Sequence, residues 1–319
     1  MTMTGESRAV AVALITHDAC LEHDTGAWHP ESPDRLRAVL RALEGEDFQA
    51  LLRKAAPLAT PEHLARVHPE SYLRSILDLA PVPGETIALD ADTMFSAGSR
   101  AAALRAAGGA VQGVDAVMAG CARRAFVAVR PPGHHAGRAR AMGFCLFANA
   151  AIAARHAQAR WGLRRIAVVD FDVHHGNGTQ DIFFDDPDLF YASSHQFPCY
   201  PGTGAATERG VAGNIVNAPL PPGATGAAFR AAWSGTLLPA LERFAPELLI
   251  VSAGFDAHKA DPLAQLRLET ADFGWITEHL VAVATRHCAG RLVSLLEGGY
   301  DLDALAASAA MHVRTLLQT

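Results

Sequence analysis

Short apolar runs alternate with longer stretches of helical periodicity along most of the chain. Runs of a few β-branched and other apolar residues predict strands, and apolar residues spaced three or four positions apart predict helices. The predicted strands cover residues 8–15, 125–130, 166–170, 189–193, 247–252 and 291–296, with a short or edge strand at 215–220. The predicted helices cover 33–43, two short segments starting near 61 and 69, and 97–119, 147–161, 225–244, 272–288 and 302–317. Residues 81–96 are expected to form a loop.

This alternation of strands and helices predicts an α/β fold with a mostly parallel sheet and helices on both of its faces. The sequence contains no internal repeat, no low-complexity segment and no linker rich in Pro or Ser. We therefore expect residues 1–319 to form a single domain.

Polar residues follow five of the predicted strands at the point where each strand ends. In an open α/β sheet, ligands bind outside the carboxyl ends of the strands. The residues that would meet at this edge are His134 and His135, Asp170, Asp172 and His174, Ser193 and Ser194, Asp256, and Tyr300. Because five separate stretches place ionisable or hydroxyl side chains at one edge of the sheet, they predict an active site there.

The stretch 166–180 is the most informative of the five. Carboxylates and imidazoles that follow a buried strand are costly to bury without a metal or hydrogen-bonding partners. Asp170, Asp172 and His174 alternate, so they would share one face if the strand geometry continued that far. Oxygen and nitrogen ligands suit Zn²⁺ or Fe²⁺, with Asp256 as a more distant ligand. The weaker alternative to a metal site is a polar loop whose histidines are satisfied by hydrogen bonds.

The remaining polar residues suggest a reaction. The pair His134 and His135 could act as base and acid, with Asp170 and Asn177 each orienting one imidazole. Tyr300 follows two glycines and could direct its O–H at a carbonyl oxygen. Together with a metal, these groups predict hydrolysis of an amide. A serine nucleophile is not expected, because the chain has no GxSxG motif.

Composition restricts the partners and the compartment. The formal net charge of −6 and the pI near 6.2 argue against direct nucleic-acid binding. The five cysteines are scattered and lack a CxxC pair, which favours a reducing compartment. The apolar run near the N-terminus is predicted to be a strand rather than a signal peptide, and no apolar stretch has the length of a membrane span. A cytoplasmic protein is therefore expected.

Six ordered motifs resemble those of the histone deacetylase superfamily, in particular its bacterial class II branch and the acetylpolyamine amidohydrolases. The motifs are PPGHHA, GFC, DFDVHHGNGTQ, YPGTG, SAGFDAHKADPL and EGGYD, and with HPESPDR at 29–35 the resemblance extends over nearly the whole chain. It implies the arginase–deacetylase fold with an eight-stranded parallel sheet. It also implies Zn²⁺-dependent removal of acyl groups from amines, with Fe²⁺ as an alternative ion.

The resemblance also implies a role for individual residues. Asp172, His174 and Asp256 would be the metal ligands and Tyr300 the donor to the acyl oxygen. His135 would be the general base, and the acid to the leaving amine. His134 would be its electrostatic partner, oriented by Asp170, and Asn177 stands where many class I members have Asp. A structural K⁺ site would use Asp170, Asp172, His174, Ser193 and Ser194, partly through backbone carbonyls.

The channel and its rim are assigned by the same resemblance. Gly143 and Phe144 would line the acyl channel, with Tyr200 on the opposite wall. Asp92 would either bind the substrate backbone at the rim or cap the helix that starts near residue 97. Leu263 occupies the position where polyamine-selective eukaryotic members carry Glu.

Four functions remain open at this point. Leu263 and the short 81–96 loop favour an acyl-lysine deacylase over a hydrolase of acetylated polyamines. The complete ligand set and Tyr300 argue against a binding module without activity. Arginase-like enzymes with two Mn²⁺ ions typically show DxHxD, whereas this chain has DFDVHH, so one catalytic metal is expected. The oligomeric state, the acyl-chain preference and the physiological substrate are left open by the sequence.

Overall fold

The computed structural model describes residues 11–319, and its centre is one parallel sheet of eight strands. The strand order is β2-β1-β5-β10-β9-β6-β7-β8, and each neighbouring pair runs parallel. The strands are β1 (Val12–Thr16), β2 (Leu52–Ala55), β5 (Arg124–Val127), β6 (Ile166–Asp170), β7 (Leu189–Gln196), β8 (Ile215–Leu220), β9 (Leu248–Ala253) and β10 (Leu292–Leu296). The central strands are buried along their whole length, as expected for a parallel sheet covered on both faces.

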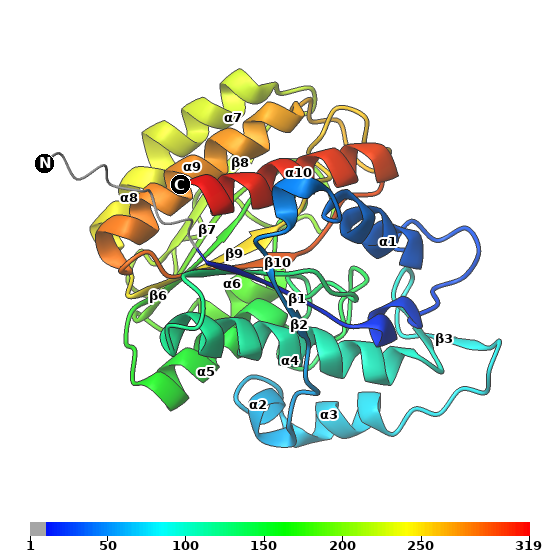
Figure 1. The fold of residues 1–319 in the computed structure, drawn as a ribbon. Helices are drawn as coiled ribbons and strands as arrows, with labels where there is room; N and C mark the ends of the chain where they lie inside the picture. The colour runs from blue at the N-terminus through cyan, green and yellow to red at the C-terminus, as the bar shows by residue number, and fades with distance from the viewer. Residues whose placement is uncertain (1–10) are drawn as a thin grey trace, which may run out of the picture.

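Helices cover both faces of the sheet (Figure 1). One layer contains α1 (Pro33–Ala42), α7 (Gly226–Ala232), α8 (Leu238–Phe244), α9 (Thr270–His287) and α10 (Leu302–Gln318). The other contains α2 (Pro61–Ala65), α3 (Glu70–Leu77), α4 (Ser99–Met118) and α5 (Asn149–Trp161). The short helix α6 (Asn177–Phe183) follows β6. No helix within the described residues has the length and apolar character needed to cross a membrane.

The predicted α/β fold with a parallel sheet is confirmed, and three local predictions change. The short strand β2 was not predicted, because its four residues are exposed and show no apolar alternation. The expected loop 81–96 contains an antiparallel hairpin of β3 (Thr86–Ala88) and β4 (Met94–Ser96). The expected helix 225–244 is interrupted by a π-helical turn over Trp233–Leu237. The predicted strand 8–15 lies partly outside the described residues.

Candidate active site and metal centre

The carboxyl ends of the central strands bring the predicted site residues together. Strands β5, β10, β9 and β6 are successive neighbours in the sheet. The segments that follow them carry, in that order, the pair His134 and His135, Tyr300, Asp256, and Asp172 with His174. Residues far apart in the sequence therefore meet at one edge, because parallel neighbours end on the same side.

Three of these residues form a candidate metal centre. The ligand atoms of Asp172, His174 and Asp256 all lie within 4.8 Å of one another. His174 Nδ1 is 3.2 Å from Asp172 Oδ1 and 3.1 Å from Asp256 Oδ2, and all three residues are buried. Two carboxylates and one imidazole form a common donor set for a divalent ion with an open coordination position. The residues therefore fit the metal that the sequence predicted.

The charges at this centre also favour a cation. Burial and the adjacent charge of Asp172 raise the pKa of Asp256 to about 7. Burial would also raise the pKa of Asp172, but the charge of His134 and hydrogen bonding to His174 outweigh burial and lower that pKa. Two buried carboxylates this close repel each other when both are ionised, and a bound cation removes this repulsion.

The structure does not place Asp170 with the other two predicted ligands. Strand β6 ends at Asp170, so the strand alternation stops there and Asp172 and His174 lie in the following loop. Asp170 Oδ2 instead lies 3.0 Å from His134 Nδ1 and also accepts the Tyr191 hydroxyl at 3.0 Å. Of the predicted roles, this geometry matches the orientation of His134.

The two adjacent histidines differ in charge although their ring centroids are only 3.9 Å apart. Burial opposes the charged form of His134, but the carboxylates of Asp172 and Asp170 outweigh it and raise the pKa of His134 to about 10. Burial and the positive charges of His134 and His174 hold the pKa of His135 well below its usual range. His134 is therefore an imidazolium at neutral pH, whereas His135 is a neutral imidazole.

The tautomer of His135 follows from its partner. Its Nδ1 lies 2.8 Å from Asn177 Oδ1, and the Asn177 amide nitrogen is directed at Met142 Sδ, 3.4 Å away. Because a carbonyl oxygen can only accept, His135 Nδ1 carries the proton and donates it. The Nε2 lone pair of His135 is then available as a base.

Tyr300 is held by contacts with its ring and with its backbone. The Arg35 guanidinium lies 4.8 Å from the ring centroid, and the Phe144 ring meets the tyrosine edge-on at 5.8 Å. The Tyr300 N–H donates to Asp261 Oδ2 at 2.7 Å. Burial raises the pKa of Tyr300 well above its ordinary value despite the opposing charge of Arg35. The phenol therefore remains protonated and can donate a hydrogen bond.

Glycine is required at two positions around this centre. A Cβ on Gly298 would lie 2.1 Å from Asp256 Oδ2 and 2.6 Å from Asp172 Oδ2, so a side chain there would enter the metal site. A Cβ on Gly143 would lie 2.4 Å from the His135 ring, and its φ of 56° also favours glycine.

The predicted wall residues lie beside His134 and His135. The next residue after Gly143, Phe144, has a φ of 68° and contacts the His29 ring edge-on at 4.7 Å as well as Tyr300. Tyr200 is 39% exposed and meets the ring of His135 edge-on at 5.1 Å. Aromatic rings thus surround the approach to His135.

Across residues 11–319, the predicted rim residues, Asp92 and Leu263, form hydrogen bonds with His29 and Asp261 and none with the candidate metal ligands or the histidine pair. Asp92 lies in the turn of the β3–β4 hairpin, where its carbonyl bonds to His29 Nε2 at 2.9 Å. The alternative role of Asp92 as a helix cap is wrong, because α4 begins at Ser99 with Gly98 as its N-cap. Leu263 is 37% exposed and donates its N–H to Asp261 Oδ1 at 3.0 Å.

The serines of the expected potassium site follow the strand register. Ser193 on β7 is the register partner of Asp170 on β6. Ser193 Oγ lies 2.9 Å from His195 Nδ1, and Ser194 Oγ accepts the Trp233 indole N–H at 2.9 Å. Because both hydroxyls have other partners, these residues would offer a cation mainly their backbone carbonyls.

Residues 29–316 match the sequence model of the histone deacetylase domain. The chain belongs to the histone deacetylase family. It is 43% identical to a histone deacetylase-like amidohydrolase of Pseudomonas aeruginosa, over 86% of this chain and 73% of that protein. It is 40% identical to the chloroplastic histone deacetylase 14 of Arabidopsis thaliana, over 97% of this chain and 77% of that one. The polyamine deacetylase HDAC10 of Mus musculus is 40% identical, over 90% of this chain and 45% of that protein.

The crystal structure of the HDA15 HD domain superposes with a TM-score of 0.89 at 36% identity. The match covers 96% of this chain and 89% of the other. The family membership and the expected arginase–deacetylase fold are therefore confirmed, and with them a hydrolase of the deacetylase class. The plant relatives carry chloroplastic names, so the family does not by itself confirm the expected cytoplasmic location.

Two carboxylates of this deacetylase site were not singled out from the sequence. Glu297 Oε2 accepts the backbone N–H groups of Gly133 and His134 at 2.7 and 3.2 Å, and Oε1 accepts the Ser252 hydroxyl at 3.0 Å. Asp261 holds the backbone of Tyr300. Both residues occur inside quoted motifs, EGGYD and KADPL, and Glu297 directly follows a strand at the same edge as the other site residues. This position at a strand end is the sequence feature that could have identified Glu297 as a site residue.

Proposed function

We propose that this chain is a deacylase that uses a divalent metal, Zn²⁺ or Fe²⁺, to hydrolyse acetylated or acylated lysine side chains of proteins or peptides. Residues 1–319 would form a single catalytic domain. The observation that carries the proposal is the buried centre of two carboxylates and one imidazole beside the adjacent histidines His134 and His135, whose rings are held by Asp170 and Asn177. Membership of the deacetylase family supports an acetylated substrate.

The metal would be held by Asp172, His174 and Asp256. A divalent ion there supplies Lewis acidity, which polarises an acyl oxygen and lowers the pKa of water. His135 acts first, taking a proton at Nε2 from the attacking water while Asn177 holds its Nδ1–H. The charge of His134, paired with Asp170, favours the negative charge that develops at the reacting centre.

Tyr300 would donate its phenolic O–H to the acyl oxygen as negative charge grows there. When the C–N bond breaks, His135 returns the proton from Nε2 to the leaving amine. The products are a carboxylic acid and a free amine. Gly143, Phe144 and Tyr200 would line the path of the acyl-lysine, with Asp92 at its rim.

A structural K⁺ would bind near the ends of β6 and β7, where Asp170 and Ser193 are register partners. It would be coordinated through Asp170, Asp172, His174, Ser193 and Ser194, with backbone carbonyls supplying part of the shell. The five unpaired cysteines are consistent with a reducing location such as the cytoplasm.

Hydrolysis of acetylated polyamines is the second candidate, because the chain is 40% identical to a mouse polyamine deacetylase. Leu263 favours acyl-lysine instead. A polyamine carries further cationic amines, and an apolar rim residue offers them no countercharge.

Metal analysis and activity on one preparation test the proposal. The purified enzyme should contain about one catalytic divalent ion per chain, lose turnover on acetyl-lysine peptides when the ion is removed by a chelator, and be inhibited by a hydroxamate. Asp256→Ala should lose both metal and turnover. Asp185→Ala, which removes an exposed carboxylate elsewhere, serves as the matched control. An active Asp256→Ala enzyme with full metal content would refute the assignment.

A further inference from the structure

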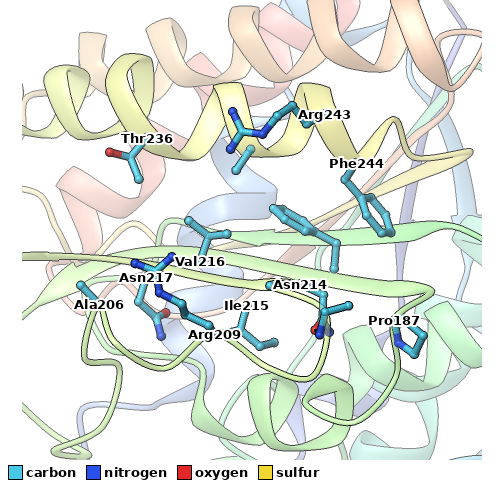
Figure 2. Close-up of a pocket in the computed structure, with 14 residues that line it drawn as sticks. Pro187, Ala206, Arg209, Asn214, Ile215, Val216, Asn217, Thr236, Arg243 and Phe244 are labelled. Atoms are coloured by element: carbon cyan, nitrogen blue, oxygen red, sulfur yellow. The ribbon is translucent and has the colours of Figure 1, made fainter.

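A second pocket lies at the edge of the sheet, apart from the deacetylase centre. It has a volume of about 480 Å³ and lies between the edge strand β8, the preceding loop and helix α8 (Figure 2). None of the residues assigned to the metal centre, the histidine pair or the acyl channel lines it. Its size is typical of pockets for small molecules.

Two arginines enter this pocket from opposite sides, Arg209 from the loop and Arg243 from α8 (Figure 2). Within residues 11–319, neither guanidinium has an ion-pair or hydrogen-bonding partner, and no Asp or Glu lines the pocket. Of the nearby acids, Asp188 pairs with Arg164 and Glu242 with Arg286. Glu208, next to Arg209 in the chain, accepts hydrogen bonds from the Gln180 side chain and from the backbone N–H groups of Gly204 and Ala205. The pocket therefore carries two positive charges, both on exposed arginine side chains without a paired carboxylate.

The wall between the arginines is apolar and aromatic. Phe190 and Phe244 stack with their ring centroids 5.0 Å apart, and Val216 of β8 continues this surface, whereas Ile215 lines the pocket from the opposite face of the strand. Such a wall can cover the body of a small organic molecule while the guanidinium groups bind its charged end.

A buried amide also lines the pocket. Asn217 is 5% exposed, and its Nδ2 donates to Gln180 Oε1 at 2.7 Å. Its Oδ1 is buried without a hydrogen-bond partner in the described part of the chain. Because this oxygen is buried it is not open to the pocket, and Asn217 contributes to the wall through its bond to Gln180.

The backbone of one wall is unusual as well. Thr236 belongs to the π-helical turn Trp233–Leu237, which is anchored to β7 by the bond from the Trp233 indole to Ser194. Single π-helical turns inside α-helices occur frequently at functional sites.

We propose that this pocket binds a small organic anion. Its carboxylate or phosphate group lies between Arg209 and Arg243, and its apolar body packs against Phe190 and Phe244. Both anionic groups accept bidentate hydrogen bonds from guanidinium, so the experiment compares them directly.

Calorimetric titration of the metal-loaded enzyme, with a hydroxamate present to block the acyl channel, tests the proposal. The probes are phenyl phosphate, benzoate and neutral benzyl alcohol at matched ionic strength. We expect at least one of the two anions to bind with a Kd below about 1 mM, and benzyl alcohol to bind at least about tenfold more weakly. The anion with the lower Kd shows whether the pocket prefers a phosphate or a carboxylate group.

Variants locate the binding. The double substitution Arg209→Gln and Arg243→Gln should weaken the binding of the anion by at least about tenfold, and Thr236→Trp, which fills the pocket but keeps both charges, should also weaken it. Arg41→Gln removes an exposed arginine on α1 and should leave the affinity unchanged. The proposal is overturned if neither anion binds below about 1 mM. It is also overturned if the double variant binds like the wild type, or if Arg41→Gln weakens binding as strongly.

Discussion

Asp261 accepts the backbone N–H of Tyr300 at 2.7 Å through one carboxylate oxygen. The other oxygen accepts the N–H of Leu263 at 3.0 Å. One largely buried carboxylate therefore connects Tyr300, which would bind the acyl oxygen, with Leu263, the proposed rim residue. The backbone of Tyr300 is held by this bond and by Arg35, whose Nε donates to Gly299 O at 2.5 Å.

Asp261→Ala should reduce kcat by about 10- to 100-fold, because a displacement of about 1 Å at a catalytic group has effects of this size. The metal content should stay unchanged, since Asp261 is not one of the three ligands. Asp303→Ala, an exposed carboxylate on α10, is the matched control. Steady-state kinetics with metal quantitation decide the outcome, and equal kcat values for the two variants would contradict the positioning role.

Tyr300→Phe should lose on the order of 10²–10³ in kcat on acetyl-lysine with a small change in KM, because the hydroxyl acts mainly in the transition state. The ring contacts with Arg35 and Phe144 remain, so the fold and the metal content should persist. The carbonyl of trifluoroacetyl-lysine needs less polarisation, so the substitution should reduce kcat less on this substrate. An equal loss on both substrates would speak against hydrogen bonding to the acyl oxygen.

Leu263 should set the preference between lysine and polyamine substrates. We expect the wild type to have a higher kcat/KM on acetyl-lysine peptides than on acetylspermidine, and Leu263→Glu to narrow this difference by about tenfold. Leu263→Gln has a similar shape without the charge and should leave the difference nearly unchanged. A wild-type preference for acetylpolyamines would refute the assignment of acyl-lysine as the substrate.

Asn177→Asp should change the pH dependence of kcat/KM. The pKa of His135 lies well below its usual range because of burial and of its positive neighbours, and the neutral Asn177 adds no countercharge. A carboxylate at this position favours the imidazolium, so the acidic limb of the kcat/KM profile should move to higher pH by about one unit. Thr207→Asp adds the same charge on an exposed loop and should leave the limb in place. An unchanged limb in Asn177→Asp would exclude His135 as the titrating base.

The paired His134 should stabilise the fold up to alkaline pH. Its folded-state pKa of about 10 lies above the ordinary value of 6.5, so the stabilisation is fully present below pH 6.5 and is lost as the pH rises through about 10. Asp170→Asn removes one of the two carboxylates that raise this pKa. Thermal unfolding across this pH range should therefore show an alkaline loss of stability that begins at lower pH in the variant. If stability falls over the same pH range in the wild type and in Asp170→Asn, the pairing of His134 with Asp170 is contradicted.

Most helices and strands, and much of the site chemistry, could be predicted without coordinates. Apolar periodicity is a local property, so it located seven strands of the sheet and most helices, and the motifs around His134, Asp172, Asp256 and Tyr300 lie at strand ends that can be read without coordinates. The exposed edge strand β2 and the π-helical turn were missed, because neither has a local apolar signal.

Which groups meet, and which of them are charged, depends on the folded arrangement of the chain and could not be predicted from local sequence. Asp256 joins Asp172 because β9 lies beside β6, an order that depends on long-range pairing. His134 and His135 are adjacent and chemically identical. The carboxylates of Asp172 and Asp170 raise the pKa of His134, whereas burial and the positive charges of His134 and His174 lower that of His135. The same holds for Asp261, which binds the Tyr300 backbone, and for Arg209 and Arg243, which line one pocket, because such neighbours depend on distances that folding sets.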